Sequence, residues 1–335
     1  MKLILDAMGG DNAPLEILKG AAMAAADFSD VELVIAGREA ELRALCEEQK
    51  ISTARMTFLD APDVVTMEDS PREVVMSKKN SSMALGLKAL AAGEGEAFIS
   101  AGNTGALMTG ATLLVRCVAG IKRAAIATVL PMEQPLLMID SGSNVNVTPD
   151  NLAQFAVLGS VYMKQVLGVD SPRVGLLSNG TEEHKGTPVM QEAYKLLKET
   201  DGIRFVGNIE GKQIPFAECD VLVTDGFTGN IVLKTIEGFS KFMMKKLKGM
   251  YYKNFIGKLS ALMIKGEFRA LKNSFDASEY GGAPFLGISK PVFKAHGSAD
   301  ALEIRNTIRQ AREYVNGNVS SLIAERIVAV CKEEK

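Results

Sequence analysis

Glycine-rich polar turns follow several apolar runs that have the composition of buried strands. The first lies in KLILDAMGGDNAP, where Gly9, Gly10 and Asp11 follow a strand and precede a helix. Glycines let backbone N–H groups approach a ligand, and the start of a helix carries positive potential. Because carboxylates repel phosphate, we expect Asp6 and Asp11 to shape the turn or to manage protons. The stretch is typical of an anion site and also of a tight turn with acidic caps.

Two further turns combine an amide, a hydroxyl and accessible backbone. The stretch SAGNTGALM contains Asn103, Thr104 and Gly105, and TDGFTGN contains Thr228 and Asn230. Donors that converge in this way suit a phosphate or a developing oxyanion. We expect Asn230 to donate to an oxyanion, although asparagine and threonine at these positions also suit helix caps.

A fourth turn, SNGTEEHKGTP, contains Thr181 and Lys185. A phosphate loop of the Walker type requires glycine before lysine, whereas Lys185 precedes Gly186, so that nucleotide site is excluded. A lysine in a glycine-rich turn is suited to hold phosphate, and a solvated charge run is the alternative. His296, in KAHGSADA, stands where a strand meets the start of a helix, as a cap or as a catalytic residue.

Other catalytic classes lack their residues. The sequence has no G-x-G-x-x-G dinucleotide fingerprint and no G-x-S-x-G nucleophile motif. Its four cysteines are scattered outside the polar turns, and it has two histidines, so we expect neither a metal site nor a cofactor. The remaining chemistry is positioning, in which an anion is held against an electrophile beside donors for the transition-state charge.

Short strand-like runs alternate with helical stretches along the whole chain. The expected helices are 15–26, 39–49, 105–117 and 149–167. This βαβ order predicts an α/β fold with three layers and a mostly parallel sheet, built as one interlocked domain over 1–335. Ligands bind beyond the carboxyl ends of parallel strands, so we expect the polar turns to gather at one edge of the sheet.

Charge is distributed unevenly. The formal net charge of −2 argues against a nucleic-acid partner, and without a signal segment or a membrane-length apolar window we expect a cytosolic protein. One segment, the basic excursion, consists of residues 234–272. It contains ten Lys/Arg and two Glu, which gives a local net charge of +8. Apolar residues in this excursion follow helical spacing at Ile236, Phe239, Met243, Leu247 and Met250.

Seven motifs together resemble the bacterial phosphate acyltransferase family that uses acyl carrier protein (PlsX). In chain order they are DAMGGDNAP, SKKNSSM, SAGNTGALM, NGTEEHKG, TDGFTGN, EYGGAPFLG and KAHGSADA. The resemblance implies a fold like phosphotransacetylase and isocitrate dehydrogenase, a homodimer, and transfer of a fatty acyl group from acyl-carrier-protein to inorganic phosphate for phospholipid synthesis. It implies catalytic roles for Lys185 and Asn230. The loop DSGSNVN departs from the family, with Ser143 in place of an alanine and Asn146 in place of an acid.

The resemblance also gives the basic excursion a use. We expect it to pair with a second copy and to contact the membrane through Phe255, Leu259 and Leu262, at the inner face of the cell membrane. A membrane-bound glycerol-3-phosphate acyltransferase is then a candidate partner downstream. A phosphotransacetylase that acts on acyl-CoA and a non-enzymatic membrane adaptor that binds an anionic metabolite are the alternatives.

Overall fold

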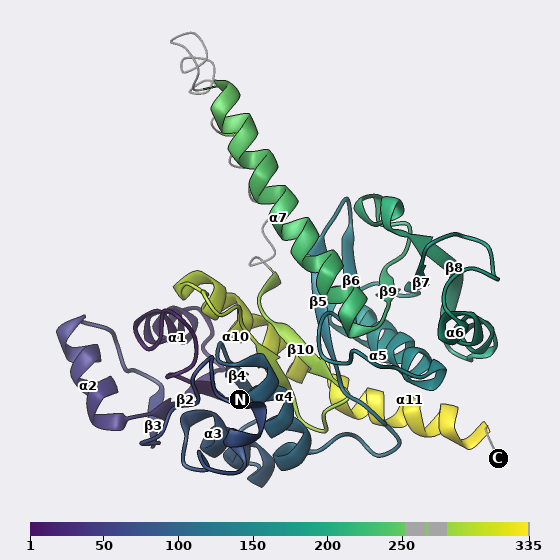
Figure 1. Cartoon of the computed structure of the whole chain (residues 1–335). Coiled ribbons are helices and arrows are strands. Elements are labelled where there is room, and N and C mark those ends of the chain that lie inside the picture. The colour runs from purple at the N-terminus through teal and green to yellow at the C-terminus, as the bar shows by residue number, and fades with distance from the viewer. Residues whose placement is uncertain (252–265, 267–279, 334–335) are drawn as a thin grey trace.

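The fold is described from a computed structural model, which covers residues 1–251, 266 and 280–333 (Figure 1). The strands are β1 Lys2–Asp6, β2 Glu32–Gly37, β3 Met56–Asp60, β4 Ala97–Ser100, β5 Ala125–Pro131, β6 Pro135–Ile139, β7 Arg173–Ser178, β8 Arg204–Glu210, β9 Val221–Val223, β10 Ala283–Leu286 and β11 Val292–Lys294. The longer helices are α1 Leu15–Asp27, α2 Glu39–Glu48, α3 Ser82–Ala92, α4 Thr104–Gly110, α5 Pro149–Leu167, α6 Pro188–Glu199, α7 Gly226–Tyr251, α10 Ala301–Asn316 and α11 Val319–Glu333.

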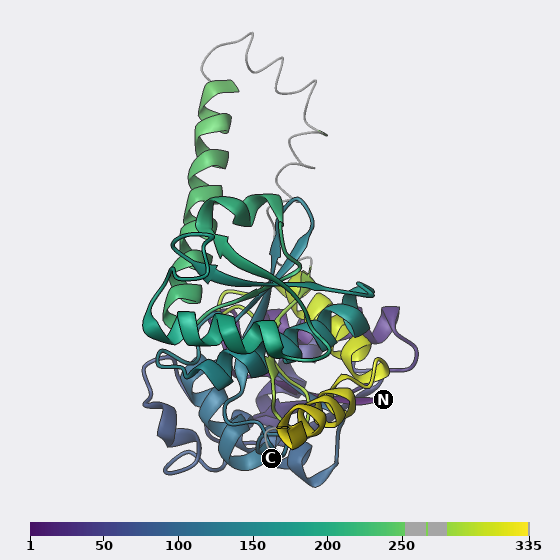
Figure 2. The same ribbon diagram turned by 90° about the vertical axis from the view of Figure 1, so that its right-hand side faces the viewer.

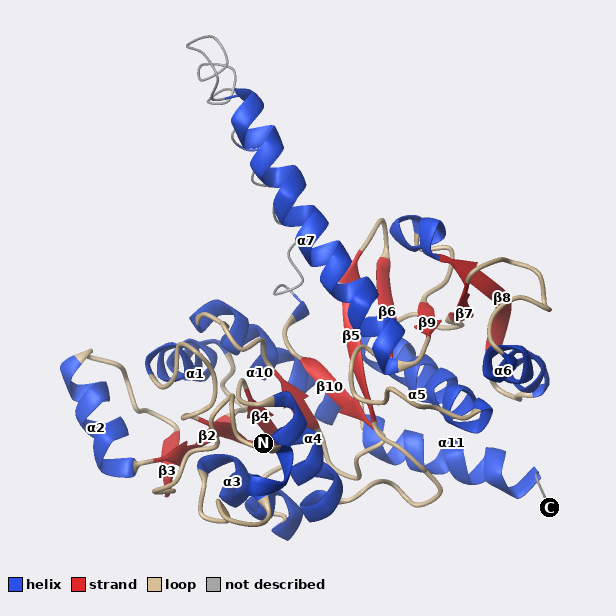
Figure 3. Cartoon of the chain, in the orientation of Figure 1, coloured by secondary structure: helices blue, strands red, loops and turns tan. Residues whose placement is uncertain are grey.

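In the described part of the chain the strands form one sheet, in the order β3-β2-β1-β4-β11-β10-β5-β6-β9-β7-β8 (Figure 3). Most neighbours are parallel, and the antiparallel pairs are β11–β10, β10–β5 and β5–β6. The predicted α/β fold with a mostly parallel sheet is therefore confirmed. The predicted helix 149–167 is α5, and the helix expected at 105–117 is α4 followed by one π-helical turn over Ala111–Val115.

Side chains that alternate along each strand separate the core into layers. Leu3 and Leu5 of β1 belong to the core on one face of the sheet, whereas Ile4 between them belongs to the core on the other. The first face is covered by α1, α2, α5, α6, α10 and α11, and the second by α3 and α4 in the N-terminal half. The base of α7 packs on this second face in the other half, through Val232, Leu233 and Ile236. Strands buried on both faces are the expected consequence of a parallel sheet.

The expectation of one common edge for all the polar turns is wrong in its simple form. The antiparallel β10 and the hairpin between β5 and β6 reverse the strand direction within the sheet. As a result, β1, β4 and β11 run in one sense, and β6, β9 and β7 run in the opposite sense. The turns form two groups, one from each half of the sheet.

Helix α7 extends far beyond the body of the protein, as the two views at right angles show (Figures 1 and 2). It has 26 residues, which corresponds to about 39 Å. Between Asn230 and Met250 none of its side chains is fully buried. The helical spacing predicted for the basic excursion is confirmed up to Tyr251, and Phe255, Leu259 and Leu262 lie outside the described residues. Within the described ranges, no helix combines the length and apolar character needed to cross a membrane.

The base of α7 is held by backbone contact. A Cβ added at Gly229 would lie 2.0 Å from the carbonyl oxygen of Asp140, and one added at Gly226 would lie 2.7 Å from the backbone nitrogen of Asn144. Backbone atoms cannot give way as a flexible side chain does, so only glycine fits at these positions.

We expect Gly229→Ala to lower the free energy of unfolding by about 3 kcal/mol, because the methyl group would force α7 away from the loop after β6. Gly238→Ala is the matched control in the same helix, since nothing lies within 4 Å of the position that its methyl group would take. It should stabilise the protein by up to about 1 kcal/mol through helix propensity. Urea unfolding measures both, and equal effects of the two substitutions would contradict the proposed contact.

Candidate functional site

The turns after β1, β4 and β11 contact one another and form the N-terminal group. A Cβ on Gly9 would lie 2.8 Å from the backbone nitrogen of Gly102, so the first two turns touch. Gly10 has φ of 105°, a conformation that favours glycine, and it lies against Ala101. The backbone N–H of Asp11 donates to the carbonyl of Gly297 at 2.7 Å, which joins the third turn to the first.

Asp6, at the end of β1, links the turns of this group through hydrogen bonds. Its carboxylate is buried and accepts hydrogen bonds from the hydroxyls of Ser82 at 2.6 Å and Ser100 at 2.7 Å. Burial raises the pKa of Asp6, and the two serine hydrogen bonds oppose that rise. The acid therefore shapes the turn, which was one of the two roles that the sequence allowed. Asp11 is exposed at the surface of the same turn.

Asn103 uses its side chain within the protein. Its amide nitrogen donates to the carbonyls of Met67 at 3.0 Å and Asp69 at 3.1 Å, and its oxygen caps α4 by accepting from the N–H of Ala106. The amide is thus already satisfied, and it ties the turn after β4 to the 66–69 loop. What this turn offers an anion is backbone N–H groups in the first turn of α4, which have no acceptor within the helix. The half-buried residues Thr104 and Gly105 carry them.

Lys294 and His296 lie at the turn after β11, which is the third turn of the N-terminal group. The Lys294 ammonium donates to the carbonyl of Ala101 at 3.0 Å and also to that of Ala295. Burial lowers the pKa of Lys294 to about 8, against the opposing charges of Glu303, Asp6 and Asp11. His296 is partly exposed, and its Nδ1 accepts from the backbone N–H of Ser298 at 3.2 Å.

The second group begins at Asp140, which is fully buried at the end of β6. Its carboxylate accepts from the backbone N–H groups of Gly142, Ser143 and Asn144 at 2.7–2.9 Å. The hydroxyl of Ser143 adds a further hydrogen bond of 2.7 Å, which reinforces the loop. Asp140 is an internal organiser of the loop.

Asn230, in the first turns of α7, lies beside the loop that Asp140 organises. A Cβ added to Gly142 would lie 3.7 Å from the side chain of Asn230, and Asn230 itself is exposed. Thr228 donates through its hydroxyl to Asp225 at 2.7 Å, and its N–H donates to the same carboxylate. Thr228 therefore supports the start of α7, while the Asn230 amide has no such partner among the hydrogen bonds of the described residues.

Lys185 lies in a pinned loop between β7 and α6. Asn208 donates to the carbonyl of Glu182 at 2.8 Å, and Gln191 donates to that of His184 at 2.8 Å. A Cβ on Gly180 would lie 2.7 Å from Cγ of Lys185, so the stem of the lysine passes directly over this glycine. The lysine is half-buried, and Thr181 at the start of the loop is exposed. The hydroxyl of Ser178, at the end of β7, is buried without a hydrogen-bond partner.

The two groups meet along α7. Asn230 follows β9, at the start of α7, and Lys185 follows β7. Because β6, β9 and β7 are parallel neighbours, both residues lie beyond the same edge of the sheet. Lys234 follows Asn230 by one helical turn and occupies the same side of the helix. Its charge acts on both His296 and Lys294, which lowers the pKa of each. The base of α7 therefore lies beside the third turn of the N-terminal group.

The described residues include no group of three or more His, Cys, Asp or Glu placed to hold a metal ion. Cys46 and Cys219 are buried, and burial raises the pKa of the Cys219 thiol to about 12. Neither thiol is thus activated as a nucleophile.

Sequence reasoning missed three of the residues that build the site. Asp140 stands out in the sequence only as a strand end, and Ser298 does not stand out at all. A signal for Lys294 was present, since a lysine at the end of the apolar run PVFK is unusual in a buried strand.

Comparison with known proteins gives consistent matches over the chain. A family model described as "Fatty acid synthesis protein" matches residues 1–322. The phosphate acyltransferase of Caldanaerobacter subterraneus subsp. tengcongensis is 44% identical over 328 residues, covering 98% of this chain and 97% of the relative. The phosphate acyltransferase of Bacillus licheniformis is 44% identical over 329 residues, covering 98% of each.

Solved structures share the fold at low sequence identity. A phosphotransacetylase from Streptococcus pyogenes has a TM-score of 0.64 and 17% identity, with 94% of each chain covered. The EutD phosphotransacetylase from Staphylococcus aureus has a TM-score of 0.59 and 18% identity, with 93% of this chain and 94% of the other covered. At this identity the likeness establishes the architecture alone, and it agrees with the fold predicted from the motifs.

Proposed function

Because this chain belongs to the phosphate acyltransferase family, as its motifs predicted, we propose that its acyl donor is an acyl carrier protein thioester. In this reaction inorganic phosphate attacks the thioester carbonyl, and acyl phosphate and the free carrier thiol are formed. The product serves phospholipid synthesis. The observation that carries the proposal is that a lysine loop and an exposed asparagine leave one edge of the sheet, and that Lys234 on the same helix as the asparagine acts on His296 of the other group.

The chemistry follows from the charges of the reactants. Phosphate is a dianion near neutral pH, so it needs a cation and N–H donors to be held, but it needs no base to become a nucleophile. We assign Lys185 the first role, supported by its half-buried position in a pinned loop. The thioester oxygen becomes negatively charged during attack, and the exposed amide of Asn230 is suited to donate to it.

The N-terminal group supplies further donors. The N–H groups of Gly10 and of the first turn of α4 are suited to contact phosphate oxygens, and His296 stands at the edge of this group. Gly9 is buried and the Asp11 N–H is donated to Gly297, so these two residues shape the turn and make no direct phosphate contact. Phe227 and Ile231 are exposed on either side of Asn230 along the first turns of α7. We propose that they contact the acyl chain, because a fatty chain requires an apolar surface beside the reacting carbonyl.

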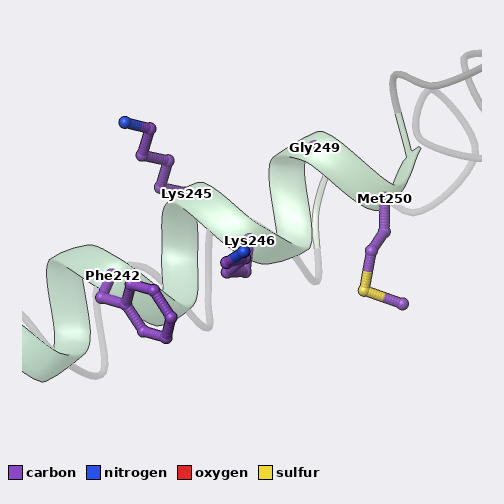
Figure 4. A pocket seen from close by; sticks show the side chains of 5 residues that line it. All are labelled: Phe242, Lys245, Lys246, Gly249 and Met250. Carbon is purple, nitrogen blue, oxygen red and sulfur yellow. The ribbon is translucent and has the colours of Figure 1, made fainter.

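The outer part of α7 is the proposed contact with a second copy. Phe239, Met243 and Met250 are exposed at helical spacing on one side, opposite the side that carries Asn230 and Lys234. In the close view of this segment, Phe242 and Met250 project to one side of the ribbon, while Lys245 projects to the other (Figure 4). An exposed apolar stripe on a helix that leaves the body suits pairing with an identical helix.

The rest of the basic excursion is proposed to contact the cytoplasmic face of the membrane. Residues 234–272 carry a net charge of +8, which suits both an anionic bilayer and an acidic carrier protein. The acyl phosphate product is lipophilic, so release at the membrane would deliver it to a membrane-bound glycerol-3-phosphate acyltransferase. Phe255, Leu259 and Leu262, the proposed contacts, lie outside the described residues.

Lys185→Ala and Asn230→Ala should each lower turnover by about 10²–10³-fold, because each removes a group that holds or stabilises negative charge. Phosphate-dependent loss of the thioester and formation of acyl phosphate measure this with acyl-carrier-protein as substrate. Circular dichroism confirms that the variants are folded. Normal acyl-phosphate formation by either variant would remove that residue from the mechanism, and a preference of the wild-type enzyme for acyl-CoA would favour the phosphotransacetylase alternative.

Phe239→Glu should convert a dimer to a monomer, because a carboxylate would be buried in the apolar contact between the two helices. Size-exclusion chromatography with light scattering measures the change. Lys248→Glu places the same side chain on the opposite side of α7 and should leave the mass unchanged. A wild-type monomer, or a dimer that survives Phe239→Glu, would argue against this interface.

Leu262→Glu should release the protein from anionic phospholipid vesicles, since it places a carboxylate in the proposed bilayer contact. Flotation with vesicles separates bound from free protein. Leu302→Glu, an exposed leucine on α10, is the matched control and should float as the wild type does. Unchanged flotation of Leu262→Glu would reject membrane contact at that residue.

A further inference from the structure

The loop that carries His296 is fixed on three sides. The backbone N–H of His296 donates to Glu303 at 2.9 Å, and the carbonyl of Gly297 accepts from Asp11 at 2.7 Å. The side chain of Asn12 donates to the carbonyl of Ser298 at 3.0 Å. These bonds attach the loop to α10 and to the turn after β1, and its Gly297 carbonyl lies against Gly10.

The hydrogen bonds around the imidazole select one tautomer. The backbone N–H of Ser298 points to Nδ1 at 3.2 Å, and the Ser298 hydroxyl lies 2.9 Å from the same atom. A backbone N–H can only donate, so Nδ1 must present its lone pair, and the proton of the neutral ring is on Nε2. The hydroxyl can rotate to donate or to turn its hydrogen away, and it does not change this assignment.

Charges from two elements, β11 and α7, act on the ring. Burial lowers the pKa of His296, and so do Lys294 at the end of β11 and Lys234 and Lys241 on α7. Glu237 of α7 acts in the opposite direction, and Glu303 of α10 and Asp11 of the first turn are further acids on the elements that hold the loop. The lysines together with burial outweigh the acids, so the neutral ring predominates near pH 7.

We propose that His296 donates a hydrogen bond through Nε2 to a substrate oxygen during the acyl transfer assigned above, and that Ser298 is the positioning residue that fixes this tautomer. The oxygen belongs either to phosphate or to the thioester carbonyl. A general base needs a free nitrogen lone pair, and here Nδ1 is occupied and Nε2 carries the proton. The proton therefore stays on the ring throughout, which agrees with a nucleophile that is already ionised.

A neutral donor is the useful form beside a dianion that must remain free to attack. An imidazolium would bind phosphate more tightly in the ground state, and binding that is equally strong before and during the reaction does not raise turnover. Burial and the charges of Lys234, Lys241 and Lys294 therefore favour the neutral form that this role requires.

Substitution with two amides tests the donor. The Gln side chain places its N–H₂ near the position of Nε2, whereas the shorter Asn reaches only the position of Nδ1. We expect His296→Ala and His296→Asn to lower turnover by about 10²-fold and His296→Gln to remain within about tenfold of the wild type. A rise in KM for phosphate would identify a phosphate contact, and a fall in kcat alone would identify the carbonyl.

Leu302→Gln is the control for a surface substitution on α10, because Leu302 is exposed and lies outside the site. It should retain activity within about twofold. Folding of each variant is checked by circular dichroism. A His296→Gln enzyme as slow as a folded His296→Ala enzyme would overturn the donor role, and so would a folded His296→Ala enzyme with normal turnover.

The tautomer is measured separately from activity. In untagged His184→Gln protein labelled with ¹⁵N-histidine, His296 is the sole histidine, so its ring nitrogens are observed alone by NMR. We expect an unprotonated Nδ1 and a protonated Nε2 at pH 7.5. An Nδ1–H tautomer or an imidazolium at that pH would refute the assignment. This inference rests on the proposed function, but absence of acyl-phosphate formation by the wild type would reject that function while leaving the NMR result readable.

Discussion

The first turn of α7 is in backbone contact with the loop that follows β6, and the positions of Asn230 and Lys234 depend on this contact. Asp140 draws three consecutive N–H groups around its carboxylate, which gives the loop a fixed path. Gly229 then lies against the Asp140 carbonyl, at a distance that admits no side chain. Because a helix is rigid over a few turns, fixing its start also fixes Asn230 and the residues one and two turns further along. The N-terminal group meets the other half of the site along this helix.

Three carboxylates at strand ends near the site are turned away from an incoming anion, which answers for Asp6 a difficulty that the sequence raised. Asp6, Asp140 and Asp225 all stand at the ends of strands, where phosphate would be repelled. In the structure each of them is turned inward and accepts hydrogen bonds from serine or threonine hydroxyls or from the backbone. The surface that remains has backbone N–H groups, an amide and lysines, with the exposed carboxylate of Asp11 at the first turn. Acids at strand ends therefore act as internal acceptors that shape the turns, while the neutral and positive groups face outward.

The sequence was sufficient to predict the elements and the family but not how the turns are divided between two ends of the sheet. Alternation of apolar runs and helices is a local signal, and α5 was predicted at its observed bounds. Strand direction is set by tertiary pairing, and nothing in PMEQPLL distinguishes a hairpin from a break within a parallel pair. The roles of Asn103 and Lys294 were hidden for a similar reason. Both side chains donate to backbone carbonyls far away in the chain, whose positions only the folded protein defines.

The two sides of α7 separate two kinds of contact. Asn230, Lys234 and Lys241 follow one another at helical spacing and face the histidine loop, whereas Phe239 and Met243 lie on the opposite side. Burial of the apolar side against a second copy would therefore leave the polar side open to phosphate and to a carrier protein. It would also hold the unsupported outer half of the helix, which has no fully buried side chain of its own within the described residues. The same helix thus connects assembly at its outer end with the position of Asn230 at its base.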